Sequence, residues 1–299
     1  MNNVEIRIRG QYDGLSEAEK RAADYFLKNP KDVMAMPVSE LARKSGASSA
    51  AWVRLCKAIG YDGLKALRLQ LFAGQVQKPS ENTQDDAISF PELKEGTSPE
   101  KILKAVVSLT QKAVSDTAQL LDPGELQKAA DAVRKADSVR IFGLGASSLV
   151  AEDLYHKLLR IGINAIFCTD SHIQLEYSAT MTEKSAAIFI SDKGQTREIQ
   201  EMLQEAHRCG STCIGITRYE KSVLSQKCDI LLYTSSPEAY VRSGAMSSRI
   251  AQLMAADALF TVIASADYEK VREPLEKSYK VCRKYRITQK RQSGVEKAK

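Results

Sequence analysis

Short apolar runs alternate with helical patterns from residue 139 onward. The apolar runs predict strands at Val139–Phe142, Ala165–Cys168, Ala186–Ile190, Thr212–Ile216 and Ile230–Tyr233. The helical patterns lie at Ser148–Ile161, His172–Met181, Thr196–Cys209 and Ala245–Ala264. Near-continuous apolar strands that alternate with helices are typical of a parallel sheet covered on both faces. We therefore predict a three-layer αβα domain with a five-stranded parallel sheet.

Helical patterns also fill the first 74 residues, which predict an all-α domain. Ser16 and Glu19 have the spacing of a capping box, so a helix should begin there and run to about Lys28. It should stop before Pro30, because the residue before a proline avoids helical geometry. A last helix, about Gly63 to Phe72, should close this domain.

Two further helices in this domain are separated by a tight turn. Ser39 can cap a short helix that Gly46 ends, and Ser48 can cap a second helix that Gly60 ends. A short helix, a glycine turn and a second helix form the helix-turn-helix pattern. The pattern indicates DNA binding, and a small helical bundle with no role in DNA binding is the alternative.

The second of these helices has one apolar and one polar face. Trp52, Leu55, Cys56 and Ile59 follow the i, i+3, i+4, i+7 spacing of a buried stripe, although Trp52 also has the chemistry of a stacking residue. Small residues on the other face allow close approach to base edges, and its two cations suit guanine or phosphate. The candidate DNA-binding residues are Ser39, Ser48, Ser49, Ala50, Val53, Arg54 and Lys57.

Composition shifts divide the chain into four segments. We predict a helix-turn-helix domain at 1–74, a linker at 75–97, an α/β domain at 98–265 and a basic helix or tail at 266–299. Residues 1–74 carry 12 basic and 8 acidic side chains, and the acidic linker segment separates them from an α/β domain with balanced charge. A basic N-terminal domain suits a polyanion, although a solvated basic face is also common. Before the first strand, helices should begin at Pro99 and Glu125.

The sequence indicates no membrane span, no signal peptide and no cysteine or histidine motif of a metal site. No apolar run approaches the roughly 18 residues of a membrane span, and the N-terminus has no apolar signal core, so we expect a cytoplasmic protein. The six cysteines form no C-x-x-C pair and are expected to be reduced core thiols. With three histidines and no H-x-x-x-H, we expect no metal site and no cofactor.

Two loops follow strands and lead into helices. They are Gly143–Ser148 and Ser191–Thr196. A helix N-terminus has unpaired N–H groups and partial positive charge, glycine lets the backbone approach a ligand, and Ser and Thr add donors. Because the carboxyl ends of parallel strands meet at one edge, the two loops should converge on a phosphate-sized anion.

These residues resemble a known family. The segments 45–48 and 53–61 resemble the helix-turn-helix of the RpiR family of bacterial transcription regulators. Gly143-x-Gly145-x-Ser147 and Ser191-x-x-Gly194-x-Thr196 resemble the two loops of the sugar isomerase (SIS) domain, which forms the C-terminal half of such regulators. The resemblance covers roughly residues 5–265, with the motifs in the family's order.

The resemblance implies a regulator, not an enzyme, controlled by a phosphorylated sugar and governing genes of sugar or amino-sugar metabolism. Because one short recognition helix reads too few base pairs alone, we expect its partners to be a palindromic double-stranded operator and a second copy of the chain, in a homodimer or higher oligomer. The candidate ligand-binding residues are Gly145, Ser147, His172, Ser191, Lys193, Gly194, Gln195 and Thr196. In the family, the position of His172 contacts the sugar. Trp52 and Ala51 also depart from the family's usual recognition helix.

Lys193 stands where the family usually has a second serine. Its ammonium group can fold over the pocket and pair with the phosphate, which is the reading we favour. Alternatively it points to solvent or pairs with Asp192 or Glu198.

Two other functions fit parts of the pattern. An SIS-type sugar-phosphate isomerase or lyase would need a base, for which His172, Glu176 and Glu152 are candidates. A dinucleotide-binding enzyme would use Gly143-x-Gly145-x-x-Ser148 with Asp170 on the ribose, but the third glycine of that fingerprint is missing.

Overall fold

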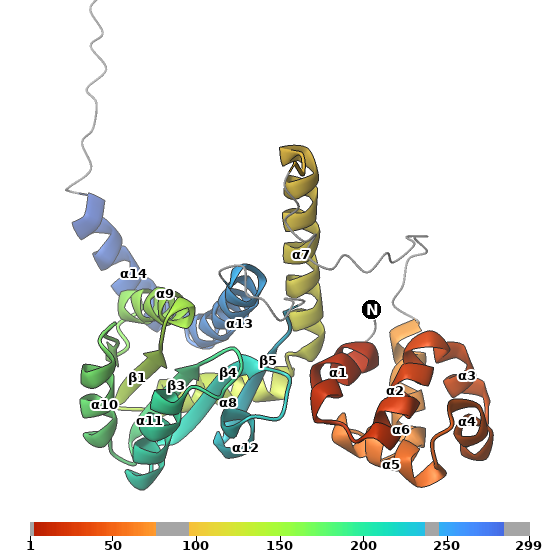
Figure 1. Ribbon diagram of the computed structural model, residues 1–299. Coiled ribbons are helices and arrows are strands. Elements are labelled where there is room, and N and C mark those ends of the chain that lie inside the picture. The colour runs from red at the N-terminus through yellow and green to blue at the C-terminus, as the bar shows by residue number, and fades with distance from the viewer. Residues whose placement is uncertain (1–2, 76–95, 237–244, 284–299) are drawn as a thin grey trace, which may run out of the picture.

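The chain folds into a helical N-terminal domain beside an α/β C-terminal domain (Figure 1). The structure is a computed structural model, and it describes residues 3–75, 96–236 and 245–283. The N-terminal domain contains α1 (Asn3–Gln11), a 3₁₀ turn (Tyr12–Gly14), α2 (Glu17–Lys28), α3 (Pro30–Ala35), α4 (Val38–Ser45), α5 (Ser49–Ala58) and α6 (Leu64–Gln75). The all-α prediction for this domain is confirmed.

The start of α2 follows the predicted capping box. The backbone N–H of Ser16 donates to the Glu19 carboxylate at 2.9 Å, and the Ser16 side chain accepts in return from the Glu19 backbone. The sequence pattern missed α1. It also missed α3, which begins at Pro30, because proline breaks a preceding helix but suits the first position of the next one.

The helix-turn-helix is formed by α4 and α5. Gly46 ends α4 in the left-handed region (φ 65°), and the Ser48 side chain accepts from the N–H of Ala51 to cap α5. The predicted cap at Ser39 is wrong, because Pro37 occupies the N-cap and Ser39 lies inside the first turn of α4. A cap must precede the helix to reach its unpaired N–H groups.

The apolar stripe of α5 forms the centre of the N-terminal core. Trp52, Leu55, Cys56 and Ile59 are fully buried, as predicted. The Trp52 indole N–H donates to the Ser45 hydroxyl at 3.0 Å, which ties α5 to α4. Trp52 is therefore a core residue, and the stacking alternative is excluded.

The C-terminal domain has the predicted five-stranded parallel sheet. Its elements are α7 (Pro99–Leu120), α8 (Pro123–Lys135), β1 (Ser138–Gly143), α9 (Ala146–Arg160), β2 (Ala165–Ile166), α10 (Ser171–Ala179), β3 (Ser185–Ile190), α11 (Arg197–Arg208), β4 (Thr212–Arg218), α12 (Val223–Lys227), β5 (Ile230–Thr234), α13 (Met246–Ser265) and α14 (Tyr268–Arg283). The strand order is β2-β1-β3-β4-β5, and each pair is parallel.

Helices cover both faces of this sheet. One core joins the sheet to α8, α9, α13 and α14, and the other joins it to α10, α11 and α12. The chain leaves β1 toward one face through α9 and leaves β3 toward the other through α11. Adjacent strands whose following helices lie on opposite faces open a crevice at their carboxyl ends, where ligands of such sheets bind.

Some predicted boundaries differ from the structure. β2 has two residues where four were predicted, and it is an edge strand paired only with β1. The predicted linker, 75–97, and the end of the basic tail lie largely outside the described residues. Within the described ranges no single helix is long and apolar enough to cross a membrane, although the bent pair α13–α14 passes that test jointly.

The two domains meet at a cluster of aromatic side chains around Arg7. The Arg7 guanidinium lies 5.2 Å from the ring centres of both Tyr61 and Tyr219. Burial raises the pKa of Tyr219, and the positive charge of Arg7 only partly opposes this. Gly10 of α1 lies so close to the Tyr219 carbonyl that any Cβ would clash with it. The interface therefore depends on a tight fit as well as on charge.

Candidate functional site

A cavity of about 360 Å³ opens at the carboxyl ends of β1 and β3. Its lining residues come from the loops after these strands and from the start of α13. They are Leu144, Gly145, Ala146, Ser147, Ile190, Ser191, Asp192, Lys193, Gln195, Thr196, Ile199, Ala245, Ser248 and Gln252. The two predicted loops thus converge, as the parallel sheet requires.

The N-termini of α9, α11 and α13 all meet at this cavity. Ala146, Thr196 and Ala245, at the starts of these helices, are lining residues. The first turns of α9 and α13 hold no acidic residue. Unpaired N–H groups and helix dipoles directed at one space favour an anion there. The α13 contribution was not predicted, because it comes from far along the chain.

The first loop is held in shape by tight backbone contacts. A Cβ on Gly143 would lie 2.8 Å from the Ser147 carbonyl, and Gly145 has φ 57° and ψ −128°. The buried Gln174 accepts from the Gly143 N–H at 3.2 Å and donates to the Gly143 carbonyl at 3.0 Å and to the Cys168 carbonyl at 2.7 Å. Gln174 therefore positions the loop without lining the cavity.

The second loop is anchored by a buried ion pair. Arg218 at the end of β4 donates to the Asp192 carboxylate at 2.6 Å, and only 6% of the Asp192 side chain is exposed. Gly194 has φ 59°, and a Cβ there would lie 2.5 Å from the Ser222 hydroxyl oxygen. Thr196 is the N-cap of α11 but makes no side-chain cap hydrogen bond. Its hydroxyl is therefore not committed to the helix it precedes.

Gln252 on α13 is a lining residue that the sequence analysis missed. It is 1% exposed, its Oε1 accepts from the Ser147 hydroxyl at 3.2 Å, and its Nε2 is buried with no hydrogen-bond partner among the described residues. A buried amide N–H without a partner is costly in free energy, so native proteins seldom leave one. A ligand acceptor in the cavity would satisfy it.

The predicted ligand-binding residues divide into three groups. Those that line the cavity are Gly145, Ser147, Ser191, Lys193, Gln195 and Thr196. Gly194 shapes the turn behind the lining. His172 is exposed at the start of α10 and does not line this cavity, nor do the candidate bases Glu152 and Glu176. In this single chain, therefore, the cavity lacks the predicted sugar-contacting histidine.

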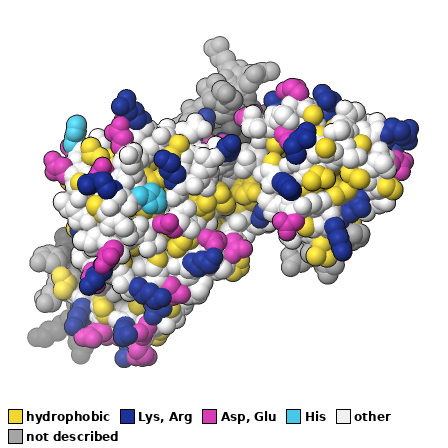
Figure 2. Space-filling model, turned by 90° about the horizontal axis from the view of Figure 1, so that it is seen from below, with side chains coloured by type: hydrophobic (Ala, Val, Ile, Leu, Met, Phe, Trp, Pro, Cys, Tyr) yellow, Lys and Arg dark blue, Asp and Glu magenta, His cyan; other side chains and the backbone are white. Residues whose placement is uncertain are grey.

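The predicted DNA-binding side chains lie on the outer face of the helix-turn-helix. All of them are exposed, which matches the predicted faces; they are Ser39, Ser48, Ser49, Ala50, Val53, Arg54 and Lys57. Figure 2 shows Lys and Arg side chains spread over the N-terminal domain, with hydrophobic side chains between them. The surface carries both the charge for phosphates and small or apolar groups for base edges.

Arg54 is paired with Glu19 of α2. The Arg54 Nε donates to the Glu19 carboxylate at 3.1 Å, while the Arg54 side chain is 55% exposed. Burial acts to raise the pKa of Glu19, but hydrogen bonds from Ser16 and the guanidinium of Arg54 outweigh it, so the pKa is lowered. The pair orients Arg54 and leaves part of its guanidinium accessible.

Comparison with known proteins assigns both domains. Residues 2–78 match the family described as helix-turn-helix domain, rpiR family, and residues 132–262 match the SIS domain. An uncharacterized HTH-type transcriptional regulator of Caldanaerobacter subterraneus is 33% identical over 94% of this chain and 97% of its own. Another such regulator, from Bacillus subtilis, is 34% identical over 94% of this chain and 97% of its own.

Solved structures share the fold. The Vibrio vulnificus NanR protein complexed with ManNAc-6P aligns over 95% of this chain and 100% of its own, with a TM-score of 0.60 at 24% identity. The sugar isomerase domain of an RpiR transcription factor from Sphaerobacter thermophilus aligns over 61% of this chain and 98% of its own, with a TM-score of 0.53 at 19% identity. From its two domains and its full-length relatives, the chain belongs to the RpiR family of HTH-type transcriptional regulators, with a C-terminal SIS domain.

Proposed function

We propose that a phosphorylated sugar binds in the cavity between the two loops and controls the binding of this regulator to DNA. The observation that carries the proposal is the meeting of the α9, α11 and α13 N-termini at a cavity lined by Gln252, whose buried Nε2 has no hydrogen-bond partner among the described residues. The NanR neighbour, whose structure contains the sugar phosphate ManNAc-6P, supports the same ligand class. The regulator would then act in the cytoplasm, and the genes it governs would belong to sugar or amino-sugar metabolism.

The lining residues suggest how the two ends of such a ligand are held. We assign the phosphate to the loop before α11, where Ser191 and Thr196 supply hydroxyls, the helix N-terminus supplies N–H groups and Lys193 supplies a positive charge. We assign the sugar end of the ligand to Ser147 and Gln252, which line the same cavity and are hydrogen-bonded to each other. The Gln252 Nε2 is a donor, so it would recognise a hydroxyl or carbonyl oxygen of the sugar.

A thermal-shift screen tests the ligand class. Sugar phosphates are compared with the same sugars lacking phosphate and with inorganic phosphate, since a ligand selective for the folded state raises the melting temperature. We expect a rise with one or a few sugar phosphates and none with the free sugars. Stabilisation by free sugars as large as by their phosphates would contradict the proposal.

For DNA, we propose that a dimer binds a palindromic operator. One recognition helix, α5, presents few side chains, so a single copy reads too few base pairs for specific binding. A gel shift with promoter fragments, run at physiological salt against scrambled competitor, should show a sequence preference. Equal retention of specific and scrambled DNA would count against this proposal.

We propose no catalytic activity. Among the described residues, the one carboxylate that lines the cavity is Asp192, and it is already engaged by Arg218. The base candidates His172, Glu152 and Glu176 stand outside the lining. Measured isomerisation or lyase turnover of a bound sugar phosphate would overturn this assignment.

We propose that the ligand acts on DNA binding by changing the position of the helix-turn-helix relative to the SIS domain. Asp192 in the second loop is bonded to Arg218, and the next residue, Tyr219, contacts the N-terminal domain. A ligand that shifts the second loop would therefore move Asp192 and its partner Arg218, and Arg218 is the chain neighbour of the interface residue Tyr219. Ligand should change operator affinity, and operator should change ligand affinity by the same factor, which parallel titrations can compare.

A further inference from the structure

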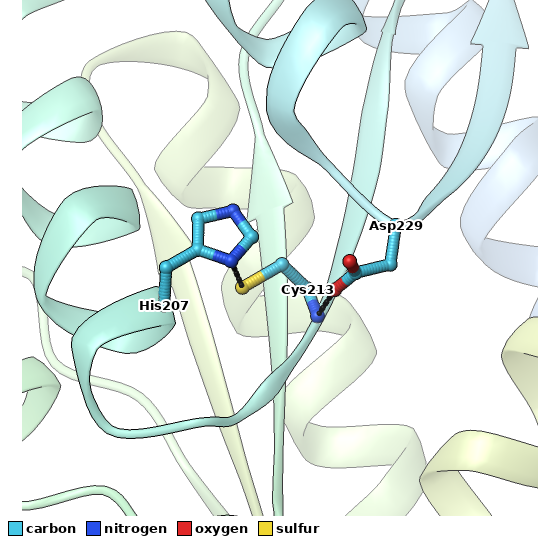
Figure 3. Close-up of side chains that lie close together, drawn as sticks. All are labelled: His207, Cys213 and Asp229. Atoms are coloured by element: carbon cyan, nitrogen blue, oxygen red, sulfur yellow. Dashed lines mark hydrogen bonds between the residues drawn. The ribbon is translucent and has the colours of Figure 1, made fainter.

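Three side-chain atoms that could bind a metal lie close together at the amino ends of β4 and β5. This is the end of the sheet opposite the sugar cavity. The three atoms belong to His207 in the last turn of α11, Cys213 near the start of β4 and Asp229 just before β5 (Figure 3). The three ligand atoms lie within 4.8 Å of one another, and the Cys213 Sγ is 3.9 Å from the His207 Nδ1. Their spacing in the sequence matches no common zinc motif, so the tertiary fold alone reveals the cluster.

The second ring nitrogen of His207 is held by the backbone. Nε2 lies 2.8 Å from the Lys227 carbonyl, and a carbonyl oxygen only accepts, so Nε2 carries the hydrogen. In the neutral ring Nδ1 is then the acceptor, and it faces the sulfur of Cys213 (Figure 3). Histidines that bind metals typically donate their other N–H to a carbonyl or carboxylate in this way, which fixes both tautomer and ring orientation.

The other two ligands are also held by the backbone. The Cys213 N–H donates to the Asp229 carboxylate at 2.8 Å, and the Asp229 N–H donates to the Cys213 carbonyl at 2.9 Å. Cys213 is buried, whereas His207 and Asp229 reach the surface. Backbone hydrogen bonds thus hold the three side chains in place, and two of the three are reached by solvent.

We propose that His207, Cys213 and Asp229 bind a divalent cation of the zinc class, with water as the fourth ligand. In tetrahedral zinc sites bonds of about 2.3 Å to sulfur and 2.0 Å to nitrogen place the donors about 3.3–3.5 Å apart, so the present separations, all within 4.8 Å, need to close by at most about 1.5 Å. On binding, the Cys213 thiol gives its proton to solvent as sulfur bonds the metal, and no oxidation occurs. Thiolate and imidazole ligands select zinc over the oxygen-preferring Mg²⁺ and Ca²⁺.

This site is separate from the sugar cavity. Cys213 and Arg218 lie on the same strand five residues apart, roughly 16 Å at about 3.3 Å per residue. The cation would clamp the end of α11 to β4 and to the segment before β5, and its expected effect is structural. The proposal does not depend on the identity of the sugar.

Metal titration of the full-length chain tests the proposal. After treatment with a chelator and a reductant, we expect about one Zn²⁺ per chain by competition with a chromophoric chelator, and a rise in melting temperature. Co²⁺ in place of Zn²⁺ should give the absorption of a thiolate–cobalt bond. Mg²⁺ at the same concentration should neither raise the melting temperature nor displace Zn²⁺ from the chain.

Matched variants assign the binding to the three residues. His207→Gln and Asp229→Asn should each weaken Zn²⁺ binding by more than about tenfold, because changing even a residue that only hydrogen-bonds to a metal ligand costs at least about that much. Asp229→Asn keeps an oxygen for the Cys213 N–H, so its folding is preserved. His156→Gln and Cys282→Ser, which remove an imidazole and a thiol elsewhere, should bind as the parent does.

Two results would contradict the zinc site. If no cobalt–thiolate absorption develops, or if His207→Gln and Asp229→Asn bind Zn²⁺ as the parent does, the cluster is a thiol–imidazole hydrogen bond and the proposal is wrong.

Discussion

The Tyr219 hydroxyl donates a hydrogen bond to the carbonyl of Ile59 at 3.1 Å, so the SIS domain directly contacts the end of α5, the second helix of the helix-turn-helix. Ile59 is the C-cap of α5, and Tyr219 follows β4. Arg7 donates to the same carbonyl at 3.3 Å. A carbonyl at a helix C-terminus carries partial negative charge and needs such donors. The position of α5 is therefore tied to the strand that also anchors the ligand loop.

Tyr219→Phe should weaken the communication between ligand and operator. The variant keeps the ring between its neighbours and removes only the hydroxyl, whose hydrogen bond contributes about 0.5–1.5 kcal/mol. We expect unchanged sugar-phosphate affinity by calorimetry and a ligand-induced change in operator affinity that differs from the parent's by about two- to tenfold. Tyr268→Phe, on the exposed start of α14, serves as the control. Identical ligand responses in Tyr219→Phe and the parent would rule out this contact as the coupling element.

Arg54→Ala and Lys57→Ala should affect DNA binding in different ways. An arginine that reads a base contributes about 1–3 kcal/mol and discriminates between sequences, so Arg54→Ala should lose affinity and specificity together. Lys57→Ala should weaken binding to all sequences alike and reduce the salt slope by about one.

Filter binding at several salt concentrations separates these effects, with the exposed Lys65→Ala of α6 as the control. Because the Arg54–Glu19 pair is partly exposed, losing it should change the melting temperature little. Equal specificity in Arg54→Ala and the parent would show that Arg54 contacts only the backbone of DNA.

Lys193→Ala should lose affinity for the phosphorylated ligand. Lys193 is exposed and lines the cavity, where its ammonium group adds a point charge to the donors of the second loop. Raising the salt concentration should reproduce part of the loss in the parent, since the pair is open to solvent. Isothermal titration measures both effects, with Lys184→Ala as the control. Unchanged or tighter binding in Lys193→Ala would show that the lysine is not a ligand.

Gln252→Leu and Gln174→Leu form a matched pair with opposite expectations. The buried Gln252 Nε2 has no hydrogen-bond partner in the part of the chain that the structure describes, so replacing Gln252 should weaken ligand binding and leave the melting temperature nearly unchanged. Gln174 satisfies the Gly143 N–H and two carbonyls, so its replacement leaves buried groups unpaired, each costing about 1–3 kcal/mol.

Thermal unfolding and calorimetry of both variants decide between a ligand residue and a structural one. A large fall in melting temperature for Gln252→Leu, with ligand affinity preserved in the folded fraction, would reverse the assignment.

Local patterns in the sequence determined the fold class, the helix-turn-helix and the two loops. These features rest on short-range physics: apolar periodicity, the Ser16 and Ser48 caps, and the positive φ of Gly46 and Gly194. Where local signals compete, the sequence was ambiguous. Ser39 was assigned as a cap although Pro37 precedes the helix, and Pro30 was taken only as a break although it begins α3.

Only the tertiary structure decided which distant residues meet. Gln252 lies 105 residues from Ser147, and Tyr219 lies 160 residues from Ile59, yet each pair is hydrogen-bonded. The sheet order and the helices that return to it bring these residues together, and no periodicity within one element encodes such pairings. For the same reason the third helix N-terminus at the cavity, the domain interface around Arg7 and the His207–Cys213–Asp229 cluster emerged only once the chain was folded.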